Sequence, residues 1–99
     1  MNIKEYKIGS RLEIQQLDSS GKGRGPVYVS QLLHAPNEKN VVIASPIFES
    51  VDVPIRTGAV LKVVSLHERY GLLNFDAVVK ATRKKGNISM LVLEITSPI

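Results

Sequence analysis

Apolar residues recur at every second position through most of this chain, and nowhere at the spacing of a helix face. The alternation is cleanest where Leu73, Phe75 and Ala77 are separated by Asn74 and Asp76. Successive side chains of a strand point to opposite faces of a sheet, so a period of two predicts strands with one buried face. Phe75 is therefore expected in the core, and no segment predicts a helix of two or more turns.

Residues typical of turns divide the chain into six substantial strands and one short piece. Strands are predicted over residues 9–17, 26–33, 41–43, 59–66, 70–82 and 88–96. The loop Asp18–Pro26 is rich in glycine and serine, and the hairpin turn Arg83–Asn87 contains Gly86-Asn87, which can adopt positive φ. The stretch Ile47–Arg56 is irregular, because Pro54 lacks a backbone donor; it holds at most a short edge strand or crossover.

This number and spacing of strands predict an all-β fold, a small six- to seven-stranded antiparallel (split) barrel. Closing the sheet would remove its exposed edges, which matters in a valine-rich sheet. The length of 99 residues and an apolar fraction of 43% fit one globular domain over residues 1–99. The chain has no cysteine, no apolar run long enough to span a membrane and no signal peptide, so we expect a cytoplasmic protein without membrane insertion.

The positive charge is concentrated in two clusters. The net charge is +4, and most charged residues are scattered singly along the strands. Lys22 with Arg24 and the run Arg83, Lys84 and Lys85 both fall where hairpin tips are predicted. Basic hairpin tips are typically solvated turns that aid solubility. The alternative hypothesis is that Arg83, Lys84 and Lys85 bind a partner, because adjacent cations can steer association with an acidic surface.

Few residue patterns in the chain point to catalysis or metal binding. The two histidines, His34 and His67, are far apart and adjoin predicted turns, so they form no metal-ligand pair. The glycine-rich Gly21–Gly25 lacks the spacing of a phosphate-binding loop and no helix follows it, so it indicates a flexible hairpin. We predict no enzyme activity, no catalytic residues, and no metal or cofactor bound by this chain.

The order of strand and turn landmarks resembles one known family. The matching segments are Gly9–Ile14, Tyr28–Leu33, Val41–Pro46, Val53–Gly58, Tyr70–Val79 and Met90–Ile95. Their order and spacing resemble the N-terminal domain of YcgR-type flagellar brake proteins, the domain that precedes PilZ. The resemblance covers nearly the whole chain and rests on the succession of segments rather than on any one of them.

The resemblance implies a non-catalytic regulatory domain of a cyclic di-GMP-responsive flagellar brake that controls motility. In that family the PilZ domain binds cyclic di-GMP through an Arg-x-x-x-Arg linker and an Asp/Asn-x-Ser-x-x-Gly motif. This chain has no Arg-x-x-x-Arg, and Asp18–Gly23 matches the second motif in the wrong place, which we interpret as accidental. The PilZ domain is thus absent from these residues, which are either one domain of a longer protein or a stand-alone relative.

The partners implied by the resemblance are the C-terminal PilZ domain of the same protein and the stator or rotor proteins of the flagellum, with recruitment to the base of the motor. Two alternative functions stay open. A small barrel with a basic surface can bind nucleic acid, but the few aromatic residues are dispersed, and nucleic acid is not the expected partner. Split barrels also bind flavins, and likeness of fold alone does not choose among these functions.

Overall fold

The computed structural model describes residues 2–48 and 51–99, which form a 3₁₀ helix, η1 (Ile3–Glu5), and eight strands. The strands are β1 (Arg11–Leu17), β2 (Gly23–His34), β3 (Asn40–Ala44), β4 (Ile47–Phe48), β5 (Val51–Asp52), β6 (Val60–His67), β7 (Gly71–Lys85) and β8 (Ile88–Ile95). All strand pairs are antiparallel. The prediction of an all-β chain is confirmed.

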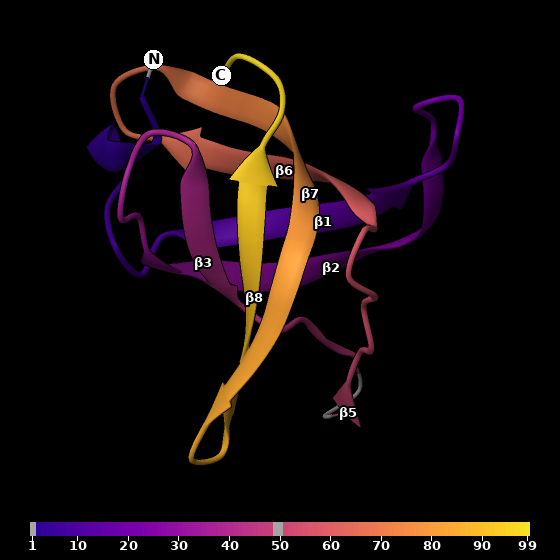
Figure 1. The fold of residues 1–99 in the computed structure, drawn as a ribbon. Coiled ribbons are helices and arrows are strands. Elements are labelled where there is room, and N and C mark those ends of the chain that lie inside the picture. Colours follow the sequence, from indigo (N-terminus) through magenta and orange to yellow (C-terminus); the bar gives the residue numbers. More distant parts are fainter. Residues whose placement is uncertain (1, 49–50) are drawn as a thin grey trace.

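Six strands close into a barrel in the order β1-β6-β7-β8-β3-β2, because β1 pairs with β2 as well as with β6 (Figure 1). The two-residue strands β4 and β5 extend the sheet beyond β2 and form its edge. The predicted barrel and the predicted short edge piece between Ile47 and Arg56 are therefore both confirmed. Glu49 and Ser50, within that piece, lie outside the described residues.

The barrel interior is filled by the alternate side chains that the period of two predicts. Phe75 is 2% exposed, whereas its neighbour Asn74 is exposed. The buried apolar core consists of Ile3, Tyr6, Leu12, Ile14, Leu32, Val41, Ile43, Ile55, Leu61, Val63, Phe75, Ala77, Val79, Leu91 and Leu93. Because every barrel strand contributes to this set, burial fixes the register of each strand against its neighbours.

The N-terminal lead packs against the barrel, which the sequence did not predict. Asn2 caps η1 by accepting a hydrogen bond from the backbone N–H of Lys4, at 2.9 Å. The turn places Ile3 and Tyr6 in the core, 1% and 5% exposed. The ring of Tyr6 meets His67 edge-on, with 5.7 Å between ring centroids, and burial raises the pKa of the Tyr6 hydroxyl.

The largest departures from the predicted boundaries are at two hairpins. β2 begins at Gly23 rather than Pro26, since Gly23 and Arg24 pair with Leu17 and Gln16 of β1. β7 continues to Lys85, so the turn between β7 and β8 contains only Gly86 and Asn87. In both hairpins the paired partner strand holds the backbone extended where the side chains alone suggest a loop.

Candidate functional site: the basic groove of the β7–β8 arm

The hairpin of β7 and β8 projects beyond the barrel, at the lower end in Figure 1. β6 pairs with β7 only as far as Val78, and β3 pairs with β8 only as far as Met90. A β-bulge between Val79 and Ala81 shifts the register where β7 leaves the barrel. Bulges bend a strand and increase its twist, so this one redirects the hairpin. We call Thr82–Leu91 the arm.

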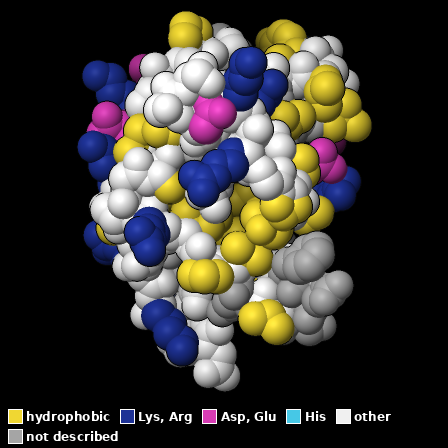
Figure 2. All heavy atoms as spheres, turned by 90° about the vertical axis from the view of Figure 1, so that its right-hand side faces the viewer, with side chains coloured by type: hydrophobic (Ala, Val, Ile, Leu, Met, Phe, Trp, Pro, Cys, Tyr) yellow, Lys and Arg dark blue, Asp and Glu magenta, His cyan; other side chains and the backbone are white. Residues whose placement is uncertain are grey.

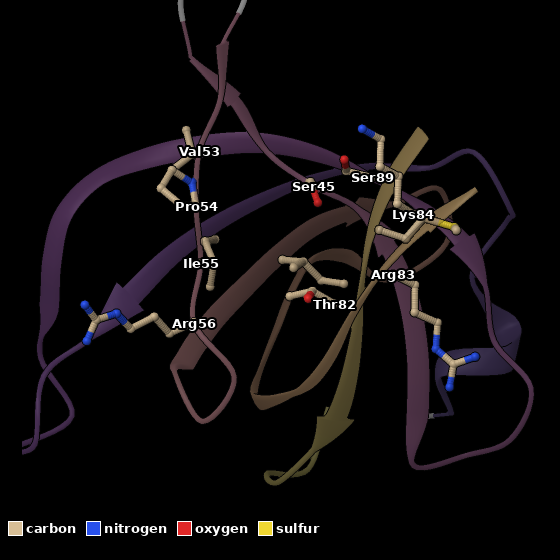
Figure 3. Close-up of a pocket in the computed structure, with 11 residues that line it drawn as sticks. Ser45, Val53, Pro54, Ile55, Arg56, Thr82, Arg83, Lys84 and Ser89 are labelled. Carbon is tan, nitrogen blue, oxygen red and sulfur yellow. The ribbon is translucent and has the colours of Figure 1, made fainter. Parts of the chain in front are cut away.

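The three predicted site residues, Arg83, Lys84 and Lys85, are the last residues of β7 and are all exposed. The sequence predicted them in the hairpin turn, and that placement was wrong. In a strand their side chains alternate between two faces, and Figure 3 shows Arg83 and Lys84 pointing in opposite directions. The run of cations is therefore divided over both faces of the arm.

A groove of about 450 Å³ lies between the arm and the segment Val53–Arg56. Figure 3 shows this segment on one side and the arm residues on the other. The residues that line the groove are Ser45, Val53, Pro54, Ile55, Arg56, Thr82, Arg83, Lys84, Ser89, Met90 and Leu91. We call this space the basic groove, because its lining combines an apolar floor with three cations and no acidic residue among the described part of the chain.

Among the side chains that the structure describes, no ion pair involves Arg56, Arg83 or Lys84. The ion pairs found within residues 2–48 and 51–99 are Lys7–Glu68, Arg11–Glu13 and Lys80–Glu94, all outside the groove. On the face drawn in Figure 2, dark-blue cationic side chains lie in both the upper and the lower part, whereas the magenta acidic side chains lie in the upper part. Cations gathered in one groove produce a local positive potential that attracts anionic groups.

Arg56 was not predicted as a member of this site. Arg56 follows Pro54 and lies far from the arm in sequence, and the path of the chain from β5 to β6 brings it to the groove. No motif links Arg56 to Arg83, so no signal in the sequence marked the pair.

The second basic cluster is organised differently, around Asp18 in the β1–β2 turn. Its carboxylate Oδ1 accepts hydrogen bonds from the backbone N–H of Ser20 at 2.9 Å, the Ser20 hydroxyl at 2.7 Å and the backbone N–H of Lys22 at 3.0 Å. These bonds and the charge of Arg24 lower the pKa of Asp18. The stretch was predicted as a flexible hairpin; it forms a hairpin, and Asp18 braces its turn. The Asp18 carboxylate binds the N–H groups that a phosphate would need.

The histidines and tyrosines have local structural roles. His67 Nδ1 accepts hydrogen bonds from the backbone N–H groups of Arg69 and Tyr70, at 3.0 and 3.3 Å, which shapes the β6–β7 turn. His34 ends β2 and is exposed. Within the described residues, no group of three His, Cys, Asp or Glu side chains is placed to hold a metal ion. None of the aromatic side chains that the structure describes lines the basic groove.

Comparisons with known proteins fit this architecture. The PilZNR family model, described as flagellar protein YcgR, matches residues 7–95. Among solved structures, the chain is similar to the Bacillus subtilis inhibitor of motility, MotI/DgrA, with a TM-score of 0.71 and 15% identity. The similarity covers 95% of this chain and 46% of that chain, so this chain spans about half the length of the inhibitor. No curated protein sequence matches. No described helix is long and apolar enough to cross a membrane.

Proposed function

This chain belongs to the PilZNR family of flagellar protein YcgR, and we propose on that basis that it is a non-catalytic interaction domain that regulates motility. The observation that carries the proposal is the family match over residues 7–95, which spans all six barrel strands. The likeness of the fold to an inhibitor of motility supports the same role. The domain acts by contact, with its exposed arm as the contact element.

In this proposal the intact protein responds to cyclic di-GMP through a C-terminal PilZ domain. The nucleotide changes how the two domains sit together, and the protein then engages the flagellar stator or rotor and slows swimming. The protein is cytoplasmic and is recruited to the base of the motor. The barrel contributes a surface to these contacts and holds no cofactor of its own.

The experiment that tests this role uses the full-length protein in a motile bacterium that lacks its own copy. Swimming speed is measured at raised cyclic di-GMP with the whole protein and with a version lacking residues 7–95. We expect braking by the whole protein and normal swimming without the barrel, at equal protein levels. Undiminished braking without residues 7–95 would show that the barrel has no part in motility control.

A second experiment concerns the nucleotide. We expect the purified chain not to bind cyclic di-GMP, because it has no Arg-x-x-x-Arg. In addition, Asp18 of the Asp-x-Ser-x-x-Gly match accepts backbone hydrogen bonds that brace a turn. Isothermal titration calorimetry measures this directly. Affinity in the micromolar range or tighter would contradict the assignment of nucleotide binding to the PilZ domain.

A further inference from the structure

We propose that the free edge of β7 in the arm receives an extended acidic segment of a partner protein, which adds to the sheet as a further strand along the basic groove. The inference rests on the proposed function as an interaction domain and deepens it, since it names the mode of docking and the chemistry of the partner. It is carried by three features: an unpaired strand edge, a groove beside it, and cations on both sides of that groove.

The unpaired edge begins where β7 leaves the barrel. On the side of β6, the last backbone contacts of β7 are those of Val79 with Gly58 and Ala59, at 2.7 and 2.9 Å. From Ala81 to Lys85, β7 pairs with β8 alone. A strand with one neighbour presents a row of N–H and C=O groups on its other side, which is a template for a further strand.

The turn of the arm determines which backbone groups face outward. Lys85 and Ile88 flank the two-residue turn, and in such a hairpin the flanking pair exchanges hydrogen bonds. Bonded and non-bonded pairs then alternate along an antiparallel ladder. Lys84 and Thr82 therefore direct their N–H and C=O groups away from β8, and both residues line the basic groove.

The groove beside this edge suits an extended chain. Pro54 lies on the opposite wall and has no N–H, and the N–H of Val53 beside it donates to the Pro46 carbonyl at 2.9 Å, so neither residue donates to the edge of β7. Ile55 and Leu91 are buried and give the groove an apolar floor on which alternate side chains of an added strand can rest. Segments that bind in this way gain affinity from main-chain bonds and specificity from alternate side chains.

The charge of the groove selects the occupant. Arg56 on one wall and Arg83 and Lys84 on the other attract carboxylates, and the other described lining residues include no acidic residue. A second copy of the same edge would place like charges opposite each other, which is unfavourable. Cations on an edge strand also discourage pairing with neutral apolar strands. An acidic partner segment can pair its carboxylates with these cations and its backbone with the free edge of β7.

Binding is tested by fluorescence anisotropy with a labelled synthetic peptide of alternating glutamate and valine, about six residues long. The intact chain is compared with the double variant Arg83→Ser/Lys84→Ser and with the charge-matched control Lys39→Ser/Lys62→Ser, whose changes lie outside the groove. We expect the groove variant to bind about tenfold more weakly or worse, and the control to bind like the wild type. Equal binding by both variants would overturn the inference.

A second peptide separates strand addition from simple charge attraction. It keeps the glutamates and valines but carries an N-methyl group on every backbone amide, which removes all backbone donors and leaves the charge unchanged. We expect this peptide not to bind, and we expect the amide of Lys84 to become protected from hydrogen exchange only with the first peptide. Equal binding of both peptides, or protection elsewhere, would overturn strand addition. Loss of peptide binding with intact braking would overturn this inference alone and leave the proposed function standing.

Discussion

The two halves of β7 belong to one continuous strand but are stabilised by different contacts. Gly71–Val78 pairs with β6, β8 joins on the other side from Ala77 onward, and Phe75, Ala77 and Val79 fill the barrel. Ala81–Lys85 pairs with β8 alone and buries no side chain. The strand conformation of the first half is determined by its apolar pattern, and that of the second half by pairing with β8 and by the turn at Gly86 and Asn87. Residues in the second half can therefore change with little effect on the fold, which frees them for recognition of a partner.

The largest expected difference between the halves is the effect of truncating a core side chain. Phe75 is 2% exposed and lies opposite Val63, so Phe75→Ala should lower the free energy of unfolding by about 3–5 kcal/mol, most of the stability of a small domain. Urea denaturation measures it. Leu72→Ala, at a 71% exposed position of the same strand, is the control and should change stability by about 0.5 kcal/mol or less. A Phe75→Ala variant that melts within a few degrees of the wild type would contradict the assigned register.

A smaller effect is expected from the turn of the arm. Gly86 has a φ of +61°, in the left-handed region, so Gly86→Ala should destabilise the arm by about 1 kcal/mol. Hydrogen exchange should quicken at arm amides and stay unchanged in the barrel. Gly86→Asn is the matched control, because asparagine tolerates this conformation better than other residues. Equal acceleration in arm and barrel would mean that the two halves of β7 unfold as one unit.

Removing the charges of the arm should change stability least. Replacing Arg83, Lys84 and Lys85 by serine should shift the free energy of unfolding by about 0.5 kcal/mol or less, because all three side chains are exposed. Thermal denaturation measures this shift, and swimming speed in cells carrying the full-length protein measures braking. We expect unchanged stability with relieved braking. Unchanged braking would leave the cluster as an aid to solubility.

The two basic hairpins should also respond differently to pH. The pKa of Asp18 is lowered in the folded protein by its bonds from Ser20 and Lys22, so its support of the β1–β2 turn is complete above the unfolded value of about 4 and is lost as the pH falls through the folded pKa. NMR should show the amide of Lys22 shifting over that range and the amide of Lys85 staying constant. Movement of both amides together would point to general unfolding in acid.

The sequence predicted the barrel well because burial of alternate side chains determines most of it. The prediction failed where backbone pairing extends a strand without burying side chains. These places are Gly23 and Lys85, whose residue types are also typical of loops. It also assigned no packing role to Ile3 and Tyr6, since their spacing matches neither a strand nor a helix of several turns.

The candidate site was predicted only in part. The run Arg83, Lys84 and Lys85 is visible in the sequence because its members are adjacent, whereas Arg56 joins them through the tertiary path of the chain. The free edge of β7 depends on where β6 stops pairing, at Val60 opposite Val78. The chain turns just before β6, at Gly58 with a φ of +93°, and the sequence predicted the start of β6 to within one residue. It did not predict that β7 continues past this point as far as Lys85, which is what leaves the edge free.

The place of β8 between β7 and β3 has a consequence for synthesis of the chain on the ribosome. β3 leaves the ribosome early, but its partner on this side is β8, which pairs Glu94 with Asn40 and is the last of the six barrel strands to emerge. Until then the nascent sheet has two open, valine-rich edges, and long-range pairings of this kind form slowly. A nascent chain that stalls before Ile88 should therefore aggregate or require a chaperone, rather than fold into a smaller barrel.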